Sequence, residues 1–124
     1  MSSRILTFGH DPTLQRTREL LLHHDGFDVV TAANGLEAAR VLEHQHFDLL
    51  ILCHTIREQE RSSFLSLFHA SDHPAKVLVL FTGTSPLVEP GCDSVFCTFD
   101  GPGTLLAAVH GLTDDGYSTP ATAA

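Results

Sequence analysis

Cys53 and His10 are the residues of this chain whose types and placement suggest chemistry. Cys53 ends an apolar run that begins at Asp48, and His10 follows another apolar run that ends at Gly9. An imidazolium beside a thiol lowers the thiol pKa and makes the thiolate available as a nucleophile. If both runs are strands that end at the same edge of a sheet, the two side chains form a candidate redox-sensitive pair.

The same residues allow two other interpretations. Together with His54, Cys53 and His10 offer the sulfur and nitrogen ligands that Zn²⁺ prefers. However, consecutive strand residues point to opposite faces, and the spacing matches no known zinc pattern, so we predict no metal site. The simplest interpretation makes Cys53 a small buried hydrophobe, which is a common role for cysteine.

An enzyme with a cysteine nucleophile is the least supported interpretation. Such an enzyme needs a base, an orienting group and an oxyanion site besides the thiol. Only Cys53 and His10 are candidates for any of these roles. We therefore predict that the chain is not an enzyme and has no catalytic residue and no cofactor.

Apolar runs alternate with helical patterns along the chain, which predicts an α/β fold. Asp11-Pro12 and Asn34 are typical first residues of helices, and the glycines near residue 101 introduce a last helix. By contrast, residues 83–91 hold two prolines and two glycines, which predicts a loop or a single turn. The strands are expected at residues 4–8, 28–32, 48–53, 76–81 and 94–97.

Five strands separated by helices favour a doubly wound parallel sheet with strand order 2-1-3-4-5. In that order the first and third strands are neighbours whose following helices lie on opposite faces. Ligands of such sheets bind at this point, outside the carboxyl ends of the strands. Gly9, His10 and Cys53 fall there, so the sequence locates a candidate site at this edge.

From Arg4 to about Leu112 the chain resembles the response-regulator receiver family, the CheY-like domains. The residues that carry the resemblance lie in five stretches: 5–12, 26–35, 48–52, 91–93 and 105–109. The resemblance implies a flavodoxin-like sheet, and the composition of residues 83–91 implies that the family's fourth helix is shortened or missing.

The resemblance also implies five functional positions. The two acids that hold Mg²⁺ in receivers align with Gly9 and His10, and the phospho-acceptor aspartate aligns with Cys53. The switch hydroxyl aligns with Thr82 and the lysine aligns with Thr98, so only Thr82 keeps a residue of the family's type. Mg²⁺ requires oxygen ligands, and phosphoryl transfer requires charge neutralisation by metal and cation. We therefore expect a degenerate phospho-acceptor pocket.

Length and charge limit the possible partners. The chain has 124 residues, which we divide into one receiver-like domain at 1–117 and a flexible tail at 118–124. Its formal charge is −8, and Lys76 is its only lysine, which argues against nucleic-acid binding.

No apolar run reaches the ~18 residues of a membrane span. The three cysteines are an odd number without tight spacing, which favours a reduced cytoplasmic protein, and the first strand begins so close to the N-terminus that we expect no signal peptide.

These expectations converge on an atypical receiver, or pseudo-receiver, in a two-component or phosphorelay pathway. Its expected mode of action is phosphorylation-independent interaction with a protein, which includes a sensor kinase, another signalling protein or a second copy of the chain. The alternative is a redox or metal sensor that uses Cys53 and His10.

Overall fold

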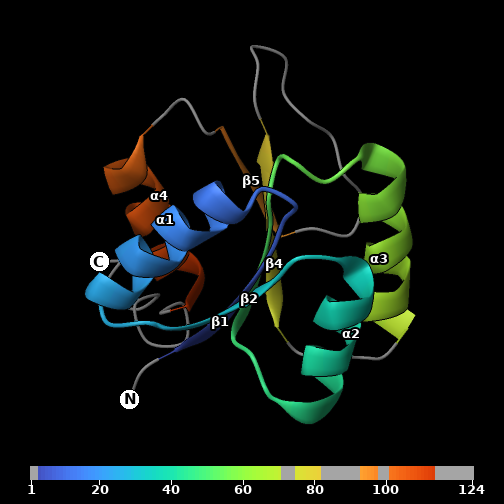
Figure 1. Cartoon of the computed structure of the whole chain (residues 1–124). Helices are drawn as coiled ribbons and strands as arrows, with labels where there is room; N and C mark the ends of the chain where they lie inside the picture. Colours follow the sequence, from blue (N-terminus) through green and yellow to red (C-terminus); the bar gives the residue numbers. More distant parts are fainter. Residues whose placement is uncertain (1–2, 71–74, 82–92, 98–100, 114–124) are drawn as a thin grey trace.

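The computed structural model describes residues 3–70, 75–81, 93–97 and 101–113. Strands and helices alternate along these residues until β4, as the sequence predicts (Figure 1). The elements are β1 (Arg4–Phe8), α1 (Pro12–His24), β2 (Asp28–Ala32), α2 (Gly35–His44), β3 (Leu49–Leu52), α3 (Glu58–Ala70), β4 (Lys76–Phe81), β5 (Ser94–Cys97) and α4 (Pro102–Thr113).

The five strands form one parallel sheet in the order β2-β1-β3-β4-β5, which confirms the predicted topology. β1 pairs with β2 on one side and with β3 on the other, so that Thr7 lies between Thr31 and Ile51. Helices α1 and α4 cover one face of the sheet, and α2 and α3 cover the other (Figure 1). The fold is therefore doubly wound, with its switch point between β1 and β3.

Side-chain caps fix the loops that lead from β1 and β2 into their helices. Asp11 accepts hydrogen bonds from the backbone N–H groups of Thr13 and Leu14, and Pro12 occupies the first helical position. Asn34 accepts from the N–H of Glu37, whose carboxylate accepts in return from Ala33 N–H. Because these caps satisfy donors that a helix start leaves open, both loops have a defined path at the carboxyl edge of the sheet.

Two apolar clusters fill the space between the sheet and its helices. One lies under α2 and α3 and includes Phe8, Leu52 and Phe64. The other lies under α1 and α4 and includes Cys53 and Phe96. Cys53 therefore belongs to the core below α1 and α4, although it stands at the edge of the sheet. The strand that precedes it ends at Leu52, one residue earlier than predicted, because the chain turns and Ile56 N–H donates to the Cys53 carbonyl.

Several predictions concern residues outside the described ranges. These are the missing fourth helix at 83–91, the two threonines Thr82 and Thr98, and the tail at 118–124. They remain predictions. Within the described residues, no helix is long and apolar enough to cross a membrane.

Candidate functional site

The ends of β1 and β3 approach so closely at the switch point that only glycine fits at position 9. A Cβ atom added to Gly9 would lie 2.8 Å from Cβ and 3.0 Å from Sγ of Cys53, and 3.2 Å from the hydroxyl oxygen of Thr55. A backbone hydrogen bond holds the two chain segments together at this point, since Cys53 N–H donates to the Phe8 carbonyl at 2.9 Å. In the observed backbone, position 9 cannot carry a carboxylate without displacing its neighbours.

Cys53 is 1% exposed and forms a hydrogen bond with a buried glutamine. Its Sγ donates to Oε1 of Gln15 at 3.4 Å. The side-chain amide of Gln15 donates to the carbonyls of Thr7 and Ala32 at 3.1 and 2.9 Å. With both amide hydrogens used, the Gln15 oxygen faces the thiol and accepts from its neutral S–H form.

The charge state of Cys53 follows from its surroundings. Burial raises the pKa of the Cys53 thiol, and the nearby guanidinium of Arg18 opposes this rise through its charge and a hydrogen bond without cancelling it. The thiol is therefore protonated at neutral pH, which agrees with its role as a donor to Gln15. This environment fits the buried-hydrophobe interpretation of Cys53.

Arg18 brings a positive charge to the pocket that the sequence interpretation did not anticipate. Its Nη2 lies 3.4 Å from Nδ1 of His54. Burial, followed by the charge of Arg18, lowers the pKa of His54, so its neutral imidazole can accept this bond, while Asp11 acts in the opposite direction. The Nη1 of Arg18 is shielded from solvent and has no acceptor among the described residues.

His10 stands at the same edge but bonds away from Cys53. Its Nδ1 lies 2.9 Å from the Ala33 carbonyl, and its Nε2 lies 2.6 Å from Oε1 of Glu60. A carbonyl and a carboxylate only accept hydrogen bonds, so both contacts are satisfied together when both ring nitrogens carry hydrogen. The hydrogen bond to Glu60 and the one to Ala33 accordingly raise the pKa of His10, against burial and the charge of Arg57.

The structure thus brings Gly9, His10 and Cys53 to one edge, as predicted, but does not pair the thiol with the imidazole. This argues against the candidate pairing of Cys53 with His10, because both ring nitrogens of His10 contact other residues. The zinc interpretation is not supported either, since His54 faces Arg18. Among the described residues, no three His, Cys, Asp or Glu side chains are grouped to hold a metal ion.

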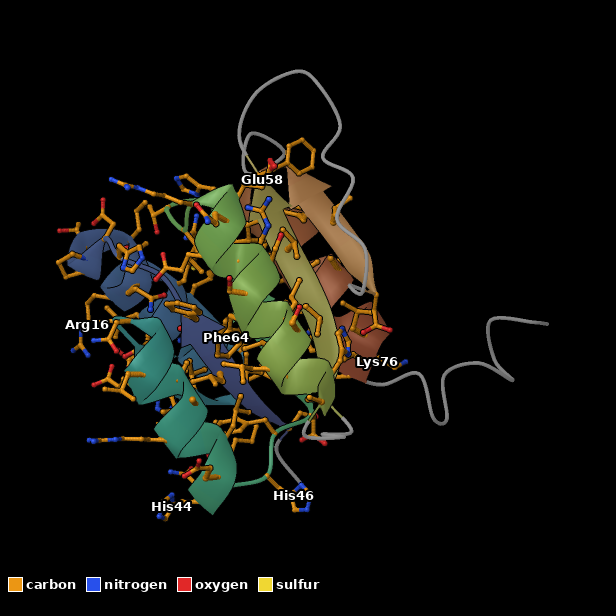
Figure 2. All side chains as sticks on the ribbon, turned by 90° about the vertical axis from the view of Figure 1, so that its right-hand side faces the viewer. Arg16, His44, His46, Glu58, Phe64 and Lys76 are labelled. Atoms are coloured by element: carbon orange, nitrogen blue, oxygen red, sulfur yellow. The ribbon has the colours of Figure 1, made fainter. Side chains whose placement is uncertain are left out.

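Four residues of this site could not be assigned from the sequence pattern. Gln15 and Arg18 lie on the inner side of α1, where polar residues three apart interrupt an apolar stripe. That interruption is the one signal that could have identified them. Thr55, which accepts from His10 N–H at 2.9 Å, and Glu60 carry no comparable pattern. The only lysine, Lys76, is the first residue of β4 and lies well below Glu58, the first residue of α3, in Figure 2.

Comparison with known proteins supports the fold. No protein-family model matches the sequence, and no curated protein matches it. The chain is similar to solved structures of the chemotaxis response regulator CheY4 of Vibrio cholerae (TM-score 0.80, 21% identity, 90% of this chain and 99% of that chain).

Two further solved structures show the same similarity. One is a CheY-like response regulator receiver domain protein from Methanospirillum hungatei (TM-score 0.80, 21% identity, 93% and 96% covered). The other is the receiver domain of the Francisella response regulator 1452 (TM-score 0.77, 16% identity, 93% and 99% covered). These similarities extend over nearly whole chains, so the protein has the CheY-like, flavodoxin-type fold.

Proposed function

We propose that this chain is a pseudo-receiver, which transmits a signal in a two-component or phosphorelay pathway by binding a protein and without being phosphorylated. The observation that carries the proposal is the identity and environment of residue 53. At the switch point of a receiver-like fold stands a buried, protonated thiol, bonded to Gln15 and packed against Gly9. A thiol at this position cannot form the acyl phosphate of an aspartate.

The two positions that align with the metal-binding acids of receivers, Gly9 and His10, support the same proposal. Mg²⁺ prefers carboxylate and carbonyl oxygens in octahedral geometry. Gly9 offers no side chain, and His10 presents an imidazolium held by Glu60 and Ala33. A cation at this place repels a metal ion rather than binding it. Arg18 does supply a positive charge near residue 53, yet a cation without the metal and the acceptor does not suffice for phosphoryl transfer.

The alternative function, a redox or metal sensor, was based on a contact between Cys53 and His10 that the structure does not show. It required Cys53 and His10 to act together, and the thiol instead has a raised pKa while His10 bonds to other residues. Low-pKa, accessible thiols are the reactive ones. The observed environment therefore favours interaction over sensing.

The proposed partner is a protein in the cytoplasm, either a sensor kinase, another signalling protein or a second copy. The exposed side chain of Val95, on the edge strand β5, supports this part of the proposal. Val95 is in register with the fully buried Val79 of β4 but is 38% exposed. An edge strand presents unpaired backbone N–H and C=O groups, which can pair with another chain. The net charge of −8 speaks against a nucleic-acid partner.

The test is incubation of the protein with acetyl phosphate and Mg²⁺, followed by intact-mass measurement. A phosphorylatable receiver treated in parallel serves as the positive control. We expect the control to gain one phosphate and this chain to gain none, because residue 53 is a thiol and no metal is held beside it. A gain of one phosphate that maps to residue 53 or its neighbours would refute the proposal.

A further inference from the structure

A separate apolar pocket lies between α1 and α4, on the face of the sheet to which Cys53 belongs. It has a volume of about 240 Å³. Its floor is formed by Leu80 of β4 and Phe96 of β5, and its walls include Leu14 and Leu21 of α1 and Leu105 of α4. Ligand sites of doubly wound sheets also lie toward the carboxyl ends of strands, and Leu80 and Phe96 are the penultimate residues of their strands.

Arg18 is the only charged side chain among the described residues that line this pocket. No carboxylate of the described residues pairs with it. Its Nη2 lies 3.4 Å from Nδ1 of the His54 ring, and within the part of the chain that the structure describes its Nη1 has no acceptor. A partly buried guanidinium with an open donor is costly, and a carboxylate that reaches it gains charge-assisted hydrogen bonds.

We propose that this pocket binds a small organic monoanion, with its carboxylate at Arg18 and its apolar body against Phe96, Leu80 and Leu105. The volume sets the size of the ligand. An apolar cavity of about 150 Å³ admits benzene, so about 240 Å³ leaves room for a ring or a short alkyl chain together with a carboxylate. The pocket is smaller than the ~300–1,000 Å³ typical of sites for drug-sized ligands.

Binding at Arg18 would reach the degenerate pocket, because the same guanidinium contacts His54 and lies beside the Cys53 thiol. The ligand would also join α1 to α4, which are already linked at one end by the hydrogen bond between His110 of α4 and Asp25, the C-cap of α1. The inference goes beyond the pseudo-receiver proposal, since the site is defined by these contacts whatever the chain's protein partner.

The test uses benzoate as the probe and benzyl alcohol as its neutral counterpart, with amide NMR shifts of the whole chain as the readout. We expect benzoate to saturate shifts in α1, β5 and α4, with a Kd in the millimolar range or tighter, and benzyl alcohol to bind at least about tenfold more weakly. Arg18→Gln should weaken benzoate binding by about tenfold or more, as loss of a charge-assisted hydrogen bond predicts. Arg16→Gln, which changes an exposed arginine paired with Glu19, should leave it unchanged.

A second pair of variants tests the pocket without touching the charge. Leu14→Trp should fill it and abolish benzoate binding, because Leu14 lines the pocket but belongs to neither core cluster. Leu20→Trp, at a leucine of the same helix that is 51% exposed, is the matched control. The absence of saturable shifts would overturn the proposal. Equal affinity for benzoate in Arg18→Gln, or for benzyl alcohol in the unchanged chain, would also overturn it.

Discussion

Gly9 and Cys53 form one steric unit at the switch point of the sheet. Sequence alone indicated that an acid of the receiver pattern was missing at each position, but not that the two replacements depend on each other. A Cβ atom at position 9 would lie 2.8 Å from Cβ of Cys53, so the side chain that fits at one position depends on the side chain at the other. The sequence could not reveal it, because the contact joins residues that are far apart in the chain and is set by the approach of β1 to β3.

This dependence predicts the effect of Gly9→Ala. The added methyl would overlap Cys53, and overpacking of this kind lowers the free energy of unfolding by about 1–3 kcal/mol. Chemical denaturation of both proteins measures the difference. Gly103→Ala is the matched control, since a Cβ at Gly103 meets nothing within 4 Å and alanine favours a helix. If overlap with Cys53 causes the loss, Gly9→Ala will lower the free energy of unfolding by less in a chain that also carries Cys53→Gly. An equal loss with and without Cys53→Gly would contradict the account.

The His10–Glu60 pair predicts a pH dependence of stability. The pKa of His10 is raised in the folded chain, so the imidazolium stabilises the fold fully below its unfolded pKa of ~6.5. This stabilisation is lost as the pH rises through the higher folded value. Both side chains are more than a third exposed, so the effect should not exceed ~1 kcal/mol.

Chemical denaturation of the chain and of Glu60→Gln measures the contribution of the His10–Glu60 pair to the free energy of unfolding. The measurements run from pH 5.5 to 8.5, roughly one unit below to two units above the ordinary histidine pKa. The difference in unfolding free energy between the two proteins should shrink as the pH rises. A difference that stays constant, or grows with pH, would show that His10 is not held as the cation.

At the scale of elements, most of the fold follows from local signals. Apolar runs predicted all five strands, and Asp11, Pro12 and Asn34 correctly marked helix starts because their capping chemistry is local. The inner side of α1 was harder to interpret. Neither Gln15 nor Arg18 was assigned a role from the sequence, and only the packed structure shows that their polar groups reach the edge of β1 and β3.

The edge strand β5 is a candidate surface for self-association of the chain. If this edge strand and its exposed Val95 mediate self-association, sedimentation equilibrium at increasing concentration should show dimers. Val95→Lys should then return the chain to monomers with little loss of stability, because Val95 is 38% exposed and lysine at a sheet edge opposes pairing. Lys substitution at exposed Leu67 of α3, away from β5, is the control. Monomers at every concentration would exclude the homodimer and leave a different protein as the proposed partner.

At the scale of the whole molecule, the chain combines a receiver-like architecture with an altered pocket. Three loops meet at the carboxyl edge. The loop after β1 holds Gly9 and His10, the loop after β2 presents the Ala33 carbonyl to His10, and the loop after β3 begins with the turn at Cys53. Each loop has its own hydrogen bonds, so the edge is organised without a metal or a phosphate. The loss of phosphorylation that we propose would then be a property of the whole site rather than of one residue.

Beryllofluoride binding by Cys53→Asp tests this claim most directly, because the substitution restores the acceptor and leaves the rest of the edge as it is. Fluorine NMR in the presence of Mg²⁺ detects the bound species, with Cys53→Ser as the matched control. We predict no bound signal in either variant: Gly9 and His10 supply no oxygen ligands for the metal, and Arg18 can pair with the new carboxylate. A bound signal in Cys53→Asp that saturates with Mg²⁺ would contradict the account, since the pocket would then be one substitution away from a working receiver.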